Sequence, residues 1–118
     1  MTSELLVVSR FDDQDPAALE PRARRVLELL SGRPGFLRGS LGRAVDDPGA
    51  WVLTTEWDSV GSYRRSMSPF DLKVEATTLF GAARDEPSAF ELLHLIDVAQ
   101  PPVSRPSERT GTARDPHA

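Results

Sequence analysis

The chain has 118 residues, a formal net charge of −4 and no cysteine. This length suits one domain with a single core, and the absence of cysteine excludes a disulfide framework and thiolate chemistry. The negative charge argues against nucleic acid as a partner. The N-terminal sequence lacks the basic start and long apolar run of a signal peptide, and no stretch reaches the ~20 apolar residues of a membrane span. We therefore expect a cytoplasmic protein with no membrane partner.

Hydrophobic periodicity and turn residues predict the element order β-α-β-β-α-β. A first helix is expected after Asp15, which is a plausible N-cap, and Pro21 either bends this helix or marks its true start. Pro69 is expected to divide the second helical region into two pieces. The strands are predicted over residues 5–11, 36–45, 50–57 and 89–98.

This order predicts an α+β, ferredoxin-like domain over residues 1–98, with a four-stranded antiparallel sheet and helices on one face. Residues 99–118 contain four prolines and almost no large apolar side chains. Such a segment cannot bury enough apolar surface to offset the entropy of ordering, so we expect a disordered C-terminal tail.

The first and last predicted strands carry large apolar side chains at both parities, as in Leu5-Leu6-Val7-Val8. A sheet covered by helices on one face would then expose a large apolar patch on the other. We expect a second copy to cover that patch, giving a sheet-to-sheet homodimer. Partial cover by the C-terminal tail is the alternative.

The strand-to-helix corner at residues 49–65 contains Trp51, Trp57 and Tyr63. Aromatic side chains favour apolar pockets, so this corner is the expected site of a small aromatic molecule. Tyr63 is a candidate hydrogen-bond donor to a substrate oxygen, and His94 is the candidate general base because its unperturbed pKa is ~6.5. Each of these side chains has a structural alternative, which is ordinary packing in the core or at an interface. No metal site is expected, because no ligand set has suitable spacing.

Three stretches, LLVVSRF, RPGFLRGSLGRAVDDPGAWVLTTEWDSVGSYRRSM and FELLHL, resemble the antibiotic biosynthesis monooxygenase (ABM) family of the dimeric α/β barrel superfamily. The resemblance covers roughly residues 4–98. It implies a pocket between the sheet and the helices of each subunit, and in some members oxygenation of polyphenolic polyketides without metal, flavin or haem. It therefore implies no cofactor for this chain.

In one oxygenase type of this family, a pocket tryptophan ends the third strand and a tyrosine follows six residues later, which matches Trp57 and Tyr63. An asparagine precedes that tryptophan by four residues, where this chain has Leu53. The haem-degrading branch has an Asn, Trp and His triad, and by approximate alignment those positions are Ser9, Ser66 and Val74 here. The resemblance thus argues against haem degradation. The expected substrate-binding residues are Trp57, Ser9, Leu53, Ser66, Met67 and Phe70, and the expected catalytic residues are Tyr63 and His94.

We therefore predict a cofactor-independent monooxygenase that acts on a small aromatic or quinone-forming metabolite. The loss of asparagine-type and histidine-type groups leaves a second prediction open, a non-catalytic dimeric protein that binds or delivers a small molecule through the same pocket. A third, an isomerase or cyclase on the same scaffold, also remains.

Overall fold

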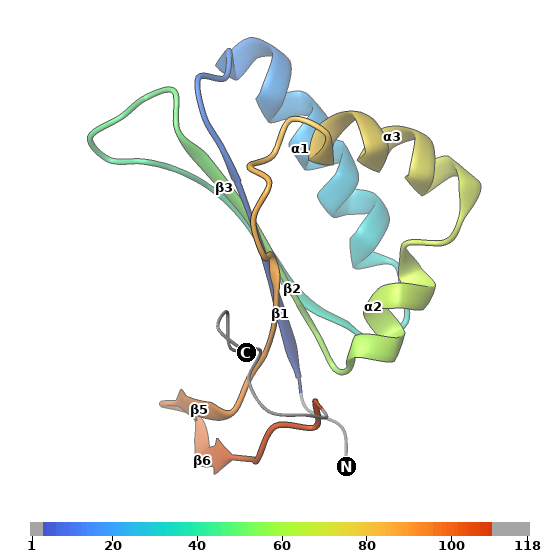
Figure 1. The fold of residues 1–118 in the computed structure, drawn as a ribbon, viewed down its shortest axis with the longest axis vertical. Coiled ribbons are helices and arrows are strands. Elements are labelled where there is room, and N and C mark those ends of the chain that lie inside the picture. Colours follow the sequence, from blue (N-terminus) through green and yellow to red (C-terminus); the bar gives the residue numbers. More distant parts are fainter. Residues whose placement is uncertain (1–3, 110–118) are drawn as a thin grey trace, which may run out of the picture.

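The protein is described by a computed structural model that covers residues 4–109, with the side chain of Asp71 left out. Its elements, shown in Figure 1, are β1 (Leu5–Phe11), α1 (Pro16–Ser31), β2 (Phe36–Arg43), β3 (Trp51–Trp57), α2 (Val60–Ser66), α3 (Phe70–Phe80), β4 (Ala89–Glu91), β5 (His94–Asp97) and β6 (Gln100–Ser104).

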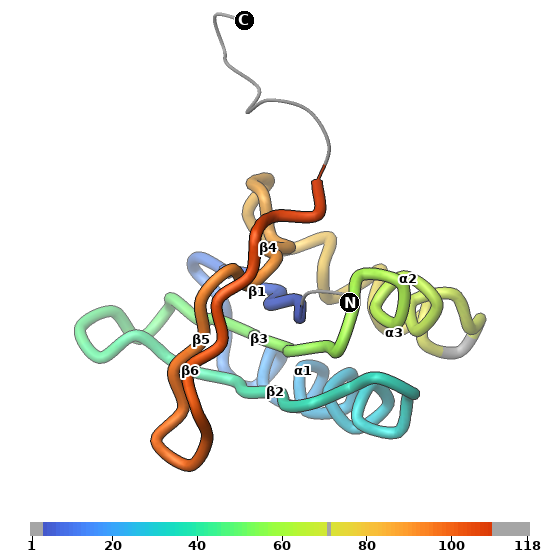
Figure 2. Tube along the Cα trace, turned by 90° about the horizontal axis from the view of Figure 1, so that it is seen from below, coloured from blue at the N-terminus to red at the C-terminus, as the bar shows by residue number. Residues whose placement is uncertain are grey.

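Four strands form one antiparallel sheet in the order β2-β3-β1-β4, and the three helices lie on a single face of it (Figures 1 and 2). The first and third strands in the chain are therefore the two central strands. This arrangement confirms the predicted ferredoxin-like fold.

Helix α1 begins at Pro16, not at Pro21. The Asp15 carboxylate accepts a hydrogen bond of 3.1 Å from the backbone N–H of Ala17 and thus caps the helix. Pro21 lies inside the helix, in its second turn, where it removes one backbone donor. The Asp15 cap, and not Pro21, therefore determines where α1 starts.

The second helical region consists of two helices, as predicted. Ser59 caps α2 by accepting a hydrogen bond of 3.1 Å from the N–H of Ser62. Pro69 stands at the N-cap of α3, because a proline cannot supply the N–H that a continuous helix would need there.

The core lies between the sheet and the helices. Every second residue of β1 and β3 points into it, so Leu5 pairs with Trp57 and Phe11 with Trp51 across the two strands. On β2, a Cβ added to Gly39 would lie only 2.7 Å from Cδ2 of Leu27 on α1. A glycine at this position leaves room for the Leu27 side chain, so α1 can pack closely against the sheet.

The predicted last strand is divided, and this part of the prediction is wrong. Glu91 pairs with Leu5, the first residue of β1, so a strand that continued beyond Glu91 would find no partner in the sheet. The chain instead turns, and His94–Asp97 pairs with Gln100–Ser104 to form a hairpin. Figure 1 shows this hairpin at one end of the sheet, on the side away from the helices.

Part of the expected disordered tail is therefore ordered: β6 lies within residues 99–118. Two backbone hydrogen bonds help to hold this region, from the N–H of Leu92 to the carbonyl of Glu4 (2.8 Å) and from the N–H of Arg105 to the carbonyl of Leu93 (2.7 Å). The tail prediction for residues 110–118 lies outside the described residues. Across residues 4–109, none of the helices is long and apolar enough to cross a membrane.

Candidate functional site

A pocket of about 240 Å³ opens between α2 and the β1–β4 edge of the sheet. It is lined by Leu5, Val60, Tyr63, Arg64, Ala89, Glu91 and Arg109. Leu5 and Ala89 belong to the sheet face that carries the helices, so the pocket is an opening at the side of the layer between sheet and helices. Its floor is apolar and its rim is charged.

Tyr63 is the predicted catalytic residue that reaches this pocket. It follows the Ser59 cap by four residues, and its backbone N–H bonds to the Ser59 carbonyl at 3.3 Å. Its ring packs on Trp57 with the ring centroids 5.9 Å apart and the planes tilted by 58°. Helix geometry and this aromatic contact together direct Tyr63 to the pocket wall.

Burial raises the pKa of the Tyr63 phenol above its ordinary value of 10.0. Low-dielectric surroundings disfavour the phenolate, and burial alone accounts for the raised pKa. The hydroxyl is thus protonated at neutral pH. It is suited to donate a hydrogen bond to an oxygen of a ligand, and it is unsuited to act as a general base.

The charged rim comes from two distant parts of the chain. Glu91 ends β4, and its side chain is only 11% exposed. It accepts hydrogen bonds from the hydroxyl of Ser107 and from the N–H of Glu108 (3.0 Å), and it lies 3.8 Å from Nε of Arg109. Arg64 approaches from α2. The rim therefore presents two guanidinium groups and one carboxylate.

Five of the predicted substrate-binding residues face the layer between sheet and helices but do not line this pocket. Trp57 is 0% exposed, and Leu53, Ser9 and Ser66 are also buried, while Met67 packs against the core at its margin. They belong to the packed layer between sheet and helices, in which Ser9 and Leu53 are cross-strand partners and Trp57 contacts Tyr63. They do not lie on an open surface.

Trp57 has a complete set of partners without a ligand. Its indole N–H donates to the Thr55 hydroxyl at 2.9 Å, and Phe36 meets its ring edge-on at a centroid distance of 5.3 Å. Its described contacts are those of a core residue that supports Tyr63 from behind.

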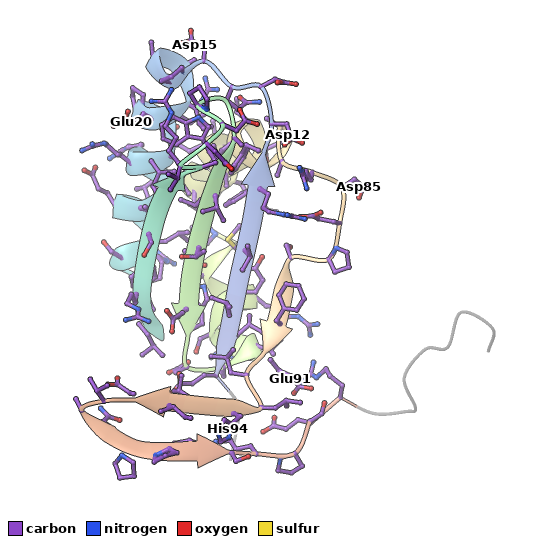
Figure 3. The ribbon with its side chains drawn as sticks, turned by 90° about the vertical axis from the view of Figure 1, so that its left-hand side faces the viewer. Asp12, Asp15, Glu20, Asp85, Glu91 and His94 are labelled. Carbon is purple, nitrogen blue, oxygen red and sulfur yellow. The ribbon has the colours of Figure 1, made fainter. Side chains whose placement is uncertain are left out.

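Phe70 and His94 are placed elsewhere. Phe70 is 81% exposed at the start of α3. His94 is exposed on β5, outside the sheet that carries the pocket, and it pairs with Ser104 of β6. Figure 3 shows His94 and Glu91 at the end of the sheet opposite to Asp12, with His94 on the hairpin. Within one chain the structure does not bring His94 to Tyr63.

Sequence reasoning missed Glu91, Arg64 and Arg109. Glu91 carried a signal, because a carboxylate in an otherwise apolar strand must find partners when it is buried. Arg64 lies beside Arg65 on α2, and a pair of adjacent arginines on a helix is typical of a solvated face. Arg109 carried no signal, since it lies far along the chain in a segment without hydrophobic periodicity.

A second hollow of about 270 Å³ lies near Trp51 and Asp12. There the Arg43 guanidinium lies 5.0 Å from the centre of the Trp51 ring, a cation–π contact. Among residues 4–109 there is no group of three or more histidine, cysteine, aspartate or glutamate side chains that could hold a metal ion.

Residues 9–68, just over half of the chain, match the family model described as "Antibiotic biosynthesis monooxygenase". Two crystal structures of SnoaB, described as a cofactor-independent oxygenase from Streptomyces nogalater, are each 26% identical to this chain, with TM-scores of 0.69 and 0.68. Each match covers 77% of this chain and 94% of SnoaB, and the first structure is a mutant. A protein from Nitrosomonas europaea is 15% identical over 79% of this chain and 93% of its own, with a TM-score of 0.64, and shows the fold alone. A search of curated proteins found no match.

Proposed function

Because the chain belongs to the antibiotic biosynthesis monooxygenase family, we propose that it is a cofactor-independent monooxygenase acting on a small aromatic or quinone-forming metabolite. The observation that carries this proposal is Tyr63, a protonated phenol on the wall of an apolar-floored pocket. The similarity to SnoaB, a cofactor-independent oxygenase, supports the same reaction class.

The chemistry places few demands on the protein. A phenolic substrate with an activated methylene group loses a proton, and the resulting anion passes an electron to O₂. Conversion of the CH₂ group to a ketone is a four-electron oxidation, one oxygen atom enters the ketone, and the other leaves as water. Because O₂ takes up all four electrons, no external reductant is needed.

Tyr63 is the proposed catalytic residue. Its hydroxyl would donate a hydrogen bond to the substrate oxygen on which negative charge develops, and such a bond is stronger in a pocket shielded from water. Trp57 is proposed to hold the Tyr63 ring in position from the core side, since their ring centroids are 5.9 Å apart. His94 lies on the hairpin outside this pocket, so we assign it no role within a single chain.

We further propose that the protein is a homodimer, formed through the sheet face that the helices leave uncovered. Leu6 and Phe90 are cross-strand partners on that face, and Phe90 is 45% exposed. Val8, on the same strand face as Leu6, is only partly buried in one chain. A second copy is the simplest cover for this apolar surface.

Oxygen uptake tests the enzymatic proposal. Wild type, Tyr63→Phe and His94→Ala would be supplied with a panel of anthrones and hydroquinones in an oxygen-electrode assay. We expect wild type to exceed the uncatalysed rate. We expect Tyr63→Phe to lower kcat by about 100-fold, the lower end of the range of about 100- to 1,000-fold for the loss of one oxyanion donor. Uptake by wild type no faster than background would reject the proposal. A comparable loss in His94→Ala would show that His94 reaches the reacting atoms in the assembly.

One observation favours the second candidate, a non-catalytic binding protein. Leu53 stands where the related oxygenase type has an asparagine, and it is a fully packed core residue. A side chain without a polar atom cannot orient oxygen or a substrate carbonyl. This candidate would be supported if wild type and Tyr63→Phe both bind an aromatic ligand tightly and neither consumes oxygen.

A further inference from the structure

The chain returns to the Tyr63 pocket after the β5–β6 hairpin. Residues 105–109, which we call the strap, run from the end of β6 back to Glu91 on β4. The backbone of Arg105 is anchored to the carbonyl of Leu93 at 2.7 Å. The strap therefore joins the hairpin to the edge of the main sheet.

Glu91 anchors the strap through its carboxylate. Both of its carboxylate oxygens are used: Oε1 accepts from the Ser107 hydroxyl, and Oε2 accepts from the N–H of Glu108 and faces Nε of Arg109. The Ser107 oxygen in turn accepts a hydrogen bond of 3.0 Å from the N–H of Arg109, which makes a tight local turn. Charge-assisted bonds to one poorly exposed carboxylate hold this turn more firmly than neutral bonds would.

When it is bound to Glu91, the strap forms part of the pocket wall. Arg109 lines the pocket together with Tyr63 and Arg64, and it also lines the adjoining hollow of about 420 Å³ at Ser59–Gly61. The charged groups that face the two spaces are the guanidiniums of Arg64, Arg65 and Arg109 and the carboxylates of Glu91 and Glu108. In the Tyr63 pocket itself, the guanidiniums of Arg64 and Arg109 outnumber the single carboxylate of Glu91, so a ligand there meets a net positive charge.

We propose that the strap forms one wall of the Tyr63 pocket, that Glu91 holds it in that position, and that Arg109 is thereby placed to bind an anionic group on a flat aromatic ligand. The inference rests on the proposed function in one respect only, that the Tyr63 pocket is the ligand site. It adds the ligand class, an aromatic body that carries a carboxylate or phenolate, and it names a specificity residue from outside the ABM-matching region.

The chemistry of the ligand follows from the residues that line the pocket. Leu5, Val60 and Ala89 provide an apolar floor for a ring system. A guanidinium binds a carboxylate through two parallel hydrogen bonds, and Tyr63, which also lines the pocket, adds a neutral hydroxyl donor. A neutral ligand of the same shape would leave Arg109 without this interaction.

The strap is tested first by limited trypsin digestion of the full chain. Cleavage after Arg109 requires the strap to leave Glu91, whereas the Arg105–Pro106 bond is resistant because of the proline. We expect Glu91→Gln and Ser107→Ala to raise the rate of cleavage after Arg109, measured by mass spectrometry, by about tenfold. Glu28→Gln, on the exposed face of α1, is the matched control and should leave the rate unchanged.

Two outcomes would overturn the proposed role of Glu91 in holding the strap. One is equal cleavage rates in wild type, Glu91→Gln and Ser107→Ala. The other is a rise in cleavage at sites throughout the chain, which would show that Glu91 supports the whole domain and not the strap. Ser107→Ala keeps the test decisive if Glu91→Gln folds poorly, since it removes the bond from the strap side alone.

The ligand class is tested with 2-naphthoate and its neutral isostere 2-naphthamide, by calorimetry. We expect wild type to bind the acid about tenfold more tightly than the amide, and Arg109→Gln to lose that preference while Arg22→Gln keeps it. Retention of the preference in Arg109→Gln, or its loss in Arg64→Gln alone, would overturn the role of Arg109. Binding of neither compound to wild type would also overturn it.

These measurements are independent of turnover. Strap cleavage and acid preference would both remain if the protein never consumes oxygen, in which case only the oxygenase proposal fails. Conversely, oxygen uptake by wild type with unchanged acid preference in Arg109→Gln would leave the function standing and remove this inference.

Discussion

The indole N–H of Trp57 donates a hydrogen bond of 2.9 Å to the hydroxyl of Thr55, two residues earlier on the same face of β3. The other tryptophan of that face is different: Trp51 is 7% exposed, and its Nε1 has no hydrogen-bond partner among residues 4–109. Two indoles on one strand therefore contribute differently to stability.

We expect Trp57→Phe to lower the free energy of unfolding by about 2–4 kcal/mol, because it removes packed ring atoms and leaves the buried Thr55 hydroxyl with one partner fewer. Trp51→Phe should change it by less than about 1 kcal/mol, since removal of an unpaired donor offsets the lost ring area and the Arg43 contact. Urea denaturation followed by circular dichroism measures both. Adding Thr55→Val to Trp57→Phe should restore part of the loss, and the reverse order of the two tryptophan variants would contradict this account.

Gly35 is the second point at which one substitution should have a large effect. It has a φ of +90°, and a Cβ there would collide with Ser62 and lie 2.7 Å from Oδ1 of Asp58. We expect Gly35→Ala to cost at least about 2 kcal/mol and to weaken ligand binding, because the Gly35 carbonyl also accepts the N–H of Asp58 just before α2.

Urea denaturation measures the loss in Gly35→Ala, and Gly32→Ala provides the control. Gly32 ends α1 with a φ of −88°, and the nearest atom to an added Cβ is 3.9 Å away. Alanine fits there without strain, so stability should stay within about 0.5 kcal/mol of wild type or rise slightly. Equal losses in the two glycine variants would show that conformation and contact at Gly35 do not decide its role.

Tyr63 is the only tyrosine of the chain, so its ionisation can be followed directly by absorbance near 295 nm. Burial raises its pKa, so ionisation should occur above pH 10.0 in the folded protein and at the ordinary value after unfolding in urea. The folded state then binds more protons than the unfolded state in this range. Stability should accordingly fall as the pH rises through the region between the ordinary and the raised pKa, and Tyr63→Phe should reduce this fall. An ordinary titration in the folded state would show that water reaches the phenol.

Two ion pairs join Arg10 of β1, and Asp12 just after this strand, to the segment that leads into β4. Arg84 bonds to Asp12 at 2.8 and 2.9 Å, and Arg10 bonds to Glu86 at the same two distances. These bonds lower the pKa of Asp12 and of Glu86 from their ordinary values of 3.8 and 4.5. The lowered pKa values add stability above the ordinary values, and this stability is lost as the pH falls through the lowered ones.

We therefore expect Asp12→Asn and Glu86→Gln to be less stable than wild type at pH 7, with the differences shrinking as the pH falls below about 4. The effects should be small and sensitive to salt, because both pairs are exposed to solvent. Thermal melts at pH 7 and pH 3 measure this. A difference that is constant with pH would point to packing and not to charge.

The uncovered sheet face leads to a prediction about assembly. We expect wild type to be a dimer by light scattering at micromolar concentration, and Leu6→Glu or Phe90→Glu to shift it towards monomer, because a charge would be buried at the interface. Lys73→Glu, at an exposed position on α3, is the control for added negative charge. A monodisperse wild-type monomer would reject the dimer.

The fold was predictable because local signals and tertiary requirements agree over most of the chain. The alternation in β3, the Asp15 cap and the break at Pro69 each act within a few residues, and each appears in the structure. The division after Glu91 was not predictable from periodicity, since it depends on where β1 begins, a distant part of the chain.

The candidate site was predictable only in part, for a similar reason. The contact between Trp57 and Tyr63 follows from a strand end and a helix start that are adjacent in sequence. The meeting of Glu91 with residues 107–109 follows from the return of the chain after a hairpin. No local pattern encodes such a return, and the residues that line the candidate pocket on that side could not be found without the structure.

The two borders of the main sheet have a consequence for the behaviour of the protein at high concentration. On one border, β4 has only three residues and follows Pro87; on the other, the pairing of β2 is interrupted between Phe36 and Arg38. Short, kinked or proline-flanked borders are poor templates for a further strand from another molecule. Growth into a continuous intermolecular sheet, the route to fibrils, is therefore disfavoured at these two borders. The proposed face-to-face dimer would then not lead to open-ended polymerisation.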